Sequence, residues 1–271
     1  MMNAHLHRQP VAIDRERHRQ ACVRWPVTDW AVASRLNSIP VTGAEFGPAC
    51  REYPVVFIAG GNDDAGQPQV LPVALLGLAP DENLFIGEGG AWRAQYLPGL
   101  LRTYPFGISR MDAQRFAVCV DAGWAGVQLA GGDGEALFGA DGEPTEFLQR
   151  TQKLLEQIEI EVQRTRVFCR KLQDLGLLRE VRLDATLADG QKIAVEGFMT
   201  VDEAKVKAMA DADVLEMHRN GMMSLVHGHF LSMGHMQRLL DWRSARVQAA
   251  ATAAAVAVAA SASASAVTQV A

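Results

Sequence analysis

Hydrophobic residues recur along this chain with two different spacings, and each spacing predicts a type of element. Two short apolar runs, at residues 53–59 and 70–78, are separated by a segment rich in Gly, Asn, Asp and Pro. Turn-forming residues between two apolar runs are typical of a β-hairpin. Residues 81–92 indicate a third short strand. Residues 115–121 indicate a fourth, because β-branched and aromatic residues lie there between polar ends.

A spacing of three and four residues replaces this pattern over residues 143–176 and predicts a long amphipathic helix. Its apolar positions, Leu148 and Val162 among them, form one stripe with charged residues between them. Thr145 fits the N-cap position, and Gly176 is typical of the residue that ends a helix. We expect the apolar stripe of this helix to pack across a sheet.

The remaining chain continues with a second hairpin and then with short helices. Polar and apolar residues alternate over 177–201 around an Asp-Gly turn signal, whereas residues 222–233 fit either a strand or a helix. Further helices are expected at residues 202–209, 211–220 and 234–246. The predicted fold class is α+β, with a curved, mostly antiparallel sheet packed against one long amphipathic helix plus shorter C-terminal helices. The expected strands of this sheet begin near Tyr53, Val70, Asn83, Arg115, Leu178 and Gln191.

Composition changes at both ends of the chain and suggests three parts. Residues 1–24 carry five Arg against one Asp and one Glu and lack the apolar run of a secretory signal, so we expect a mobile basic N-terminal arm. Residues 25–245 would form a single α+β domain. Residues 246–271 are rich in Ala and Ser, which favour a helix but insert poorly into a bilayer. We expect them to form an exposed, partly helical extension, with membrane attachment unlikely.

The overall composition narrows the class of protein. Hydrophobic residues make up 49% of the 271 residues, enough to bury a core. A net charge of −5 argues against general nucleic-acid binding. The cysteines, at positions 22, 50, 119 and 169, show no metal-ligand spacing, which favours free thiols in a reducing compartment. We therefore expect a cytoplasmic protein, with surface association as the alternative.

Several stretches of the chain resemble one known bacterial family. They are PVALLGL at 72–78, GAWRAQYLPGLLRTYPF at 90–106, LFGADGEPTEFL at 137–148 and GHFLSMGHMQRLL at 228–240. In this order they resemble the SapC family, which is named from gene clusters for surface-layer protein export, over a span from about Ile39 to Leu240. The resemblance implies an accessory role and brings no established catalytic residues. The chain departs from the family pattern in an enlarged hairpin loop at 60–69 and in its Ala-rich C-terminus.

The most distinctive polar and aromatic residues gather within one short segment. They are Trp92, Arg93, Tyr96, Arg102, Tyr104 and Phe106. One interpretation is a pocket or contact surface, where arginine meets an acidic group and aromatic rings stack. The other is that Arg and Tyr hydrogen bonds hold an irregular, Pro-containing segment on the sheet. In either case we expect Arg102, Tyr104 and Pro105 to be partly buried in a shared hydrogen-bond network.

Three histidines near the C-terminus suggest a second kind of site. His227 and His229 are two residues apart, and His235 follows six residues later. On a strand, positions i and i+2 share a face, so a divalent metal site is conceivable, and His218 could join it. The alternative interpretation is that these histidines make structural hydrogen bonds.

The chain contains none of the local sequence signatures of a nucleophilic enzyme or a phosphate-binding loop. Ser224, Ser232 and Cys119 lie outside any GxSxG motif, and Ser232 fits a helix cap instead. No cofactor is predicted apart from the divalent metal just considered. We therefore predict a non-enzymatic accessory or binding protein of the SapC type, associated with making, modifying or exporting a bacterial surface product. Its partner would be a protein or a small acidic ligand, with a homo-oligomer also open. The alternative is a metal-dependent hydrolase or oxygenase that uses His227, His229 and His235.

Overall fold

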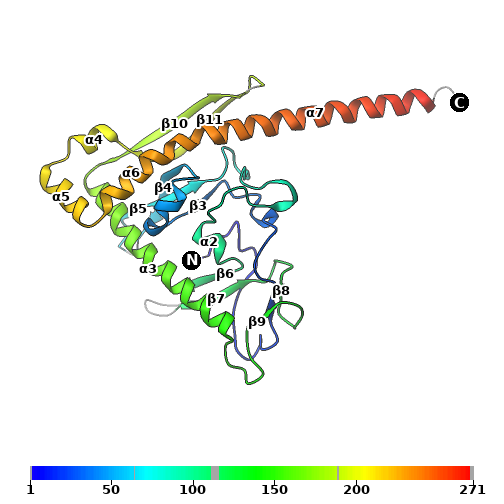
Figure 1. Ribbon diagram of the computed structural model, residues 1–271, viewed down its shortest axis with the longest axis horizontal. Helices are drawn as coiled ribbons and strands as arrows, with labels where there is room; N and C mark the ends of the chain where they lie inside the picture. Colours follow the sequence, from blue (N-terminus) through cyan, green and yellow to red (C-terminus); the bar gives the residue numbers. More distant parts are fainter. Residues whose placement is uncertain (1, 64, 111–115, 188, 269–271) are drawn as a thin grey trace.

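The structure is a computed structural model that describes residues 2–63, 65–110, 116–187 and 189–268. It confirms an α+β fold, and the strand pairs it describes are antiparallel (Figure 1). The strands are β1 (Pro10–Ala12), β2 (Cys22–Val23), β3 (Ser38–Pro40), β4 (Val55–Asn62), β5 (Pro68–Leu75), β6 (Phe106–Arg110), β7 (Phe116–Asp121), β8 (Val127–Gln128), β9 (Glu135–Ala136), β10 (Leu178–Thr186) and β11 (Lys192–Val201). The α-helices are α1 (Phe46–Ala49), α2 (Gly99–Arg102), α3 (Glu146–Asp174), α4 (Glu203–Lys207), α5 (Asp211–Arg219), α6 (Met222–Ser232) and α7 (Met236–Thr268). Short 3-10 helices are η1 (Ala31–Ala33), η2 (Gly43–Glu45), η3 (Glu88–Gly90) and η4 (Met233–His235).

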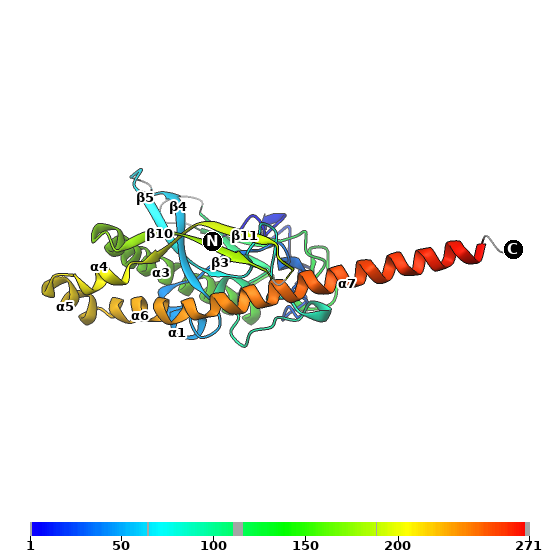
Figure 2. The same cartoon turned by 90° about the horizontal axis from the view of Figure 1, so that it is seen from above.

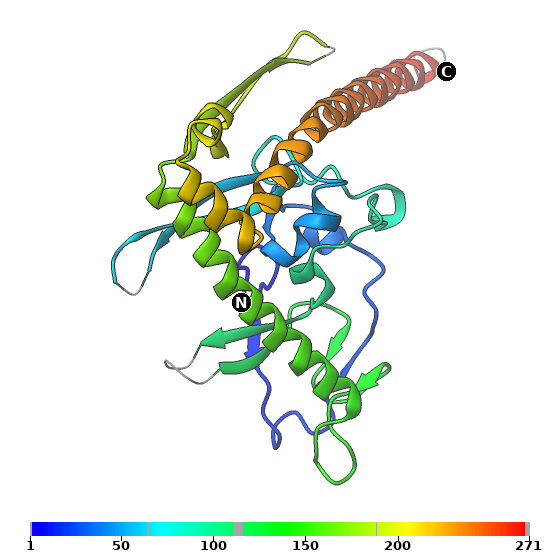
Figure 3. The ribbon, with the colours of Figure 1, turned by 60° about the vertical axis from the view of Figure 1, so that its left-hand side comes forward.

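The main sheet has five strands in the order β10, β11, β4, β5 and β3. The predicted hairpin of residues 53–78 forms its centre, where Phe57 pairs with Pro72. Strand β11 joins β4 at the pairing of Met199 with Phe57, and most of the β10–β11 hairpin projects beyond the sheet (Figure 3). Both predicted hairpins are therefore confirmed.

Helix α3 crosses the molecule and packs against β5 of the main sheet (Figures 1 and 3). Its predicted start is confirmed, because Thr145 Oγ1 accepts a hydrogen bond from the Leu148 amide at 3.3 Å. Just after its end, Gly176 has a φ of +61°, a left-handed conformation that glycine adopts without steric penalty. Leu155 and Phe168 are buried along its inner face.

A smaller hydrophobic cluster lies beside the first turns of α3, together with two sheets in the orders β1-β7-β6 and β8-β2-β9. Phe106, Val120 and Leu148 are buried in it. The prediction that residues 115–121 join the main sheet is wrong. Arg115 lies outside the described residues, and β7, the strand at the positions that follow it, pairs with β6 and β1.

The segment around Asn83 is also not a strand of the main sheet. Its side chain is used locally, because Asn83 Oδ1 accepts from the Phe85 amide at 2.9 Å and Nδ2 donates to the Ala33 carbonyl at 3.0 Å. The extended pairing that remains is a single bridge between Ile86 and Trp92. The glycines between them allow this tight reversal, as Gly89 and Gly90 both have positive φ.

The N-terminal residues that the structure describes pack against the body, whereas the sequence suggested a mobile basic arm. Strand β1 pairs with β7, and Leu6 has 0% of its surface exposed. Val23, in β2, is equally buried in the smaller cluster. The arginines dominate the composition of residues 1–24, but a few isolated apolar positions between them are sufficient to anchor the segment.

The C-terminal part is helical, and residues 222–233 form helix α6 and the start of η4. Helix α7 leaves the body as a long projecting rod (Figures 1 and 2). Its first turns are attached to the protein, because Trp242 packs edge-on against Phe85 with ring centroids 5.1 Å apart. Residues 248–254 are exposed. Among the helices that the structure describes, none combines the length and apolar character needed to cross a membrane.

Candidate functional site

The polar centre of the candidate site is the carboxylate of Glu45, which is only 7% exposed. Thr42 and Glu45 form a capping box at η2, where Glu45 Oε2 accepts from the Thr42 amide at 2.8 Å and from its hydroxyl at 3.0 Å. Glu45 Oε1 accepts from the Tyr96 hydroxyl at 2.9 Å and from the Gly99 amide at 2.6 Å. These four donors compensate for the burial of the charge and fasten the 96–99 segment to η2.

One residue of the predicted aromatic segment, Tyr96, binds this carboxylate, and a second, Arg102, contacts Tyr96. Arg102 lies over the Tyr96 ring at 5.6 Å, with one guanidinium nitrogen 3.5 Å from the Tyr96 hydroxyl. Burial, and then the nearby charge of Glu45, raise the pKa of Tyr96. The Tyr96 hydroxyl therefore stays protonated and can donate its hydrogen bond to Glu45. Arg102 itself is exposed, and the expectation that it is partly buried is wrong. Helix α2 turns Leu100 and Leu101 inward, which directs Arg102 outward.

Trp92 and Arg93 help to hold their loop against α7. The Trp92 indole donates to the Tyr53 hydroxyl at 2.8 Å, and its ring stacks on Phe85 with centroids 5.8 Å apart. The exposed Arg93 guanidinium lies 5.3 Å from the centre of the Trp242 ring. The Tyr53 hydroxyl in turn donates to the Tyr96 carbonyl, which connects these residues to the Glu45 site.

Tyr104 and Phe106 lie apart from the other four predicted binding residues. The Tyr104 hydroxyl donates to Asp121 Oδ2 at 2.8 Å, and burial, followed by this hydrogen bond, raises the pKa of Tyr104. Phe106 is buried in the smaller hydrophobic cluster against Phe147. The six residues therefore do not line one pocket, and the contacts they make fasten the segment to its surroundings.

The three histidines also have separate environments. His229 is completely buried, its Nδ1–H donates to the Val55 carbonyl at 2.7 Å, and its Nε2 accepts from the Val201 amide at 3.1 Å. Both ring nitrogens thus join α6 to β4 and β11, and burial lowers the pKa of His229. His227 is exposed, and His235 Nε2 donates to the Cys50 carbonyl at 3.1 Å.

The structure does not bring the three histidines together, because residues 227–229 are helical. Positions i and i+2 of a helix point about 200° apart, so they do not share a face as they would on a strand. Across the described residues, no group of three or more His, Cys, Asp or Glu side chains is placed to hold a metal ion. Ser232 likewise does not cap α7, since its hydroxyl accepts from the Val55 amide at 3.1 Å.

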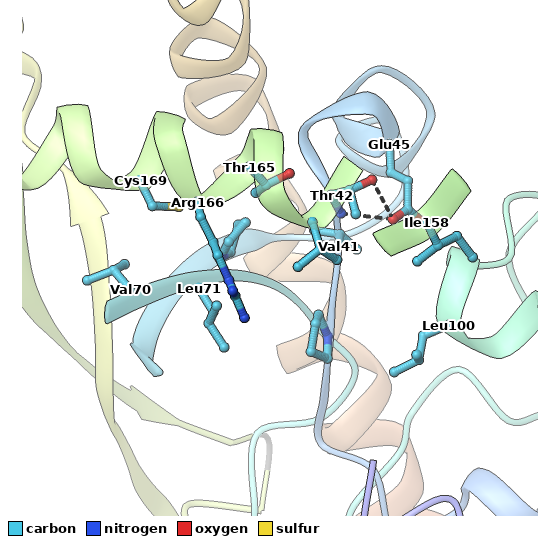
Figure 4. Close-up of a pocket in the computed structure, with 13 residues that line it drawn as sticks. Val41, Thr42, Glu45, Val70, Leu71, Leu100, Ile158, Thr165, Arg166 and Cys169 are labelled. Carbon is cyan, nitrogen blue, oxygen red and sulfur yellow. Dashed lines mark hydrogen bonds between the residues drawn. The ribbon is translucent and has the colours of Figure 1, made fainter. Parts of the chain in front are cut away.

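Next to Glu45 lies an apolar pocket between α3 and β5, called here the α3–β5 pocket (Figure 4). Helix α3 contributes Ile158, Val162 and Cys169, and the opposite walls come from Val41, Val70, Leu71 and Leu100. The free space between these walls, including the part open to solvent, is about 480 Å³. The enclosed part of this space is only about 30 Å³, so a ligand would also lie in the part that is open to solvent. The lining is mostly apolar with a few polar groups, which is typical of small-molecule sites.

Arg166 is the cationic residue of this pocket. Its side chain extends from α3 toward β5 near Leu71 (Figure 4). Its Nε atom is buried and has no hydrogen-bond partner among the described residues, and one terminal nitrogen donates to Gln163 Oε1 at a long 3.3 Å. Sequence analysis overlooked this residue, although its spacing was informative. Arg166 follows Val162 by four positions and precedes Cys169 by three, which places a charge within the apolar stripe of the helix.

Comparison with known proteins agrees with the resemblance seen in the sequence. The SapC family model matches residues 13–239, which include η2, the 90–106 segment, α3 and α6. No curated protein and no solved structure gives a significant match. Because the family model covers most of the chain, the protein belongs to the SapC family.

Proposed function

We propose that this protein is a non-enzymatic accessory protein that binds a small molecule in the α3–β5 pocket. In this proposal it works in the cytoplasm, beside machinery that makes, modifies or exports a bacterial surface product. The observation that carries the binding role is the pocket itself, an apolar cleft between α3 and β5 that opens to solvent next to a fully hydrogen-bonded carboxylate. The link to a surface product follows from the family.

The chemistry of the lining supports binding over catalysis. Burial raises the pKa of the Cys169 thiol to about 12, so it is protonated and a poor nucleophile at neutral pH. A carboxylate has about four lone-pair sites, and Glu45 uses its oxygens to accept four hydrogen bonds. The groups that could act as nucleophile or general base are therefore already engaged or unreactive.

The pocket walls are held in place before any ligand arrives. The Gly43 amide donates to Thr165 Oγ1 at 2.8 Å, which ties η2 to α3 at one edge of the pocket. Phe168, on the same helix, packs edge-on against Phe46 with centroids 6.0 Å apart. A preformed site avoids much of the ordering cost of binding.

A pocket-filling variant tests the proposal. Val162→Phe places a larger side chain in the pocket, whereas Ile160→Phe makes the same kind of change on an exposed part of α3, where Ile160 is 49% exposed. Each variant, after its melting temperature has been checked, is used to complement a deletion of the gene, and the surface product is quantified. Wild type and Ile160→Phe should restore the product, and Val162→Phe should not. Full restoration by a folded Val162→Phe protein would contradict the proposal.

Purification gives a second readout. Wild-type protein from its own cells should release a small molecule on denaturation, detected by mass spectrometry. Val162→Phe should release much less of it than Ile160→Phe does. If the molecule is converted to a product on incubation with the purified protein, the non-enzymatic part of the proposal is wrong.

A further inference from the structure

The geometry points to a ligand with a single carboxylate at one end of a short, unbranched apolar chain, with the carboxylate bound by Arg166. This inference rests on the proposed function, since it names the class of molecule that the α3–β5 pocket would take. It assigns Arg166 as the residue that selects the charged end of the ligand.

The first argument is that Arg166 differs from its basic neighbours on α3. Arg164 pairs with Glu161 at 2.7 Å, Arg170 with Asp63 at 2.8 Å, and Lys171 with Glu216 at 3.0 Å. In the part of the chain that the structure describes, Arg166 has a long hydrogen bond to the neutral side chain of Gln163 and a buried Nε without a partner. A buried donor left unpaired is costly, and an anionic ligand would satisfy it.

The second argument is that Arg166 stands at the border between two cavities. The α3–β5 pocket and a polar groove of about 1,150 Å³ both include Val70, Arg166 and Cys169 in their walls. A carboxylate at Arg166 would therefore sit where the apolar pocket meets a polar, more open space. The apolar chain would then run toward Ile158 and Leu100, at the other end of the pocket (Figure 4).

The third argument concerns the charge of the ligand. Apart from Arg166, the polar groove is lined by three carboxylates (Asp63, Asp174 and Glu216) and two cations (Arg170 and Lys171), a net charge of −1. This charge disfavours a dianionic head such as a phosphate monoester. At the far end of the pocket, Glu45 already accepts hydrogen bonds from Tyr96 and from the backbone. A second acid on the ligand would approach this carboxylate without a free donor to pair with. One negative charge, at the Arg166 end, fits both conditions.

The size of the pocket limits the length of the chain. Of the free space of about 480 Å³, only about 30 Å³ is enclosed, which is room for a few water molecules. A bound chain would therefore lie mostly in the part open to solvent, where a chain of about eight carbons fits better than a long acyl chain. Octanoate is the probe of this length.

Calorimetric titration of the full-length protein compares four probes that share a chain length. Octanoate should bind with the highest affinity. Octan-1-ol, which lacks the charge, should bind roughly ten- to a hundredfold more weakly, as expected for a lost charge-assisted hydrogen bond. Octyl phosphate should also bind more weakly than octanoate, and octanedioate should give no measurable binding. Shortening octanoate by one methylene should weaken binding about fourfold.

Variants of α3 test the assigned residue. Arg166→Met should reduce octanoate affinity to the level of octan-1-ol and leave octan-1-ol binding nearly unchanged. Arg166→Lys, which keeps the charge, should retain part of the preference for octanoate. The matched control is Arg164→Met, which removes the same charge from an exposed position of the same helix and should leave both affinities unchanged. Because Nε of Arg166 has no partner to lose, Arg166→Met should fold with an unchanged or raised melting temperature.

The outcomes separate this inference from the proposed function. Equal binding of octanoate and octan-1-ol, or unchanged octanoate binding by Arg166→Met and Arg166→Lys, would overturn the role of Arg166 while the pocket remained a ligand site. Tighter binding of octyl phosphate or octanedioate than of octanoate would overturn the single carboxylate. Failure of all four probes to bind would overturn the ligand class; the proposed function would then be judged by the Val162→Phe complementation alone.

Discussion

Replacing Glu45 with Ala should destabilise the protein strongly, because this carboxylate joins two separate parts of the chain, η2 and the 96–99 segment. The change removes the acceptor for the Thr42 amide and hydroxyl, the Tyr96 hydroxyl and the Gly99 amide. Thr42 and Gly99 are buried, so their amides would be left without access to water. An unpaired buried donor costs about 1 to 3 kcal/mol, and loss of a helix cap about 1 kcal/mol. The expected decrease in the free energy of unfolding is about 3 to 5 kcal/mol.

Urea unfolding followed by circular dichroism measures this loss, and two further variants make it specific. Glu45→Gln keeps one acceptor oxygen, so it should lose about 1 to 2 kcal/mol. Glu156→Ala removes a carboxylate from an exposed position of α3 and should change stability by less than about 0.5 kcal/mol.

A double-mutant cycle with Tyr96→Phe isolates one of the four hydrogen bonds. In wild type the loss of the Tyr96 hydroxyl should cost about 1 to 2 kcal/mol, whereas in the Glu45→Ala background it should cost almost nothing. If Glu45→Ala loses no more stability than Glu156→Ala, or if the two changes are additive, Glu45 is not the hub of this region.

Three other predictions follow from the contacts. Because burial lowers the pKa of His229 below the ordinary 6.5, the unfolded chain takes up this proton first on acidification, and the free energy of unfolding should fall as the pH drops below about 6.5. The fall should be less steep in His229→Gln, and an equally steep fall in both proteins would contradict this prediction. Deletion of residues 247–271 should leave the melting temperature nearly unchanged. Deletion from Trp242 onward removes the contact of Trp242 with Phe85 and should lower the melting temperature clearly. If the two deletions lower the melting temperature equally, the tail packs on the body. Arg102→Ala should cost at most about 1 kcal/mol in urea unfolding, since this exposed side chain contacts the Tyr96 ring, and a larger loss would reveal a buried role.

The features that sequence predicted well are those determined by neighbours in the chain. The hairpin at residues 53–78 and the helix that begins after Thr145 follow from local periodicity, turn residues and a capping side chain. The grouping of the three histidines was inferred where this local signal is weak. Residues 222–233 carry no clear periodicity, and a shared face for His227 and His229 was inferred for a strand, whereas both residues lie in helix α6.

Contacts between distant residues could not be read from the sequence. Glu45 and Tyr96 are 51 positions apart, and His229 meets Val55 across 174 positions. Periodicity reports which face of an element is buried but not which element covers it. Arg166 is an intermediate case. The sequence shows a cation within an apolar stripe, but only the structure shows that its buried Nε has no hydrogen-bond partner among the described residues.

The central claim, that the α3–β5 pocket binds a short-chain carboxylate, is tested most directly by methyl NMR during a titration with octanoate. The account predicts saturable shifts of the Leu71, Ile158 and Val162 methyl groups, which line the pocket. It also predicts that Val162→Phe abolishes these shifts and that Ile160→Phe preserves them. Saturation at a different place, such as the methyl groups of Leu154 beside Phe147, or no saturable shift within the pocket, would contradict the account.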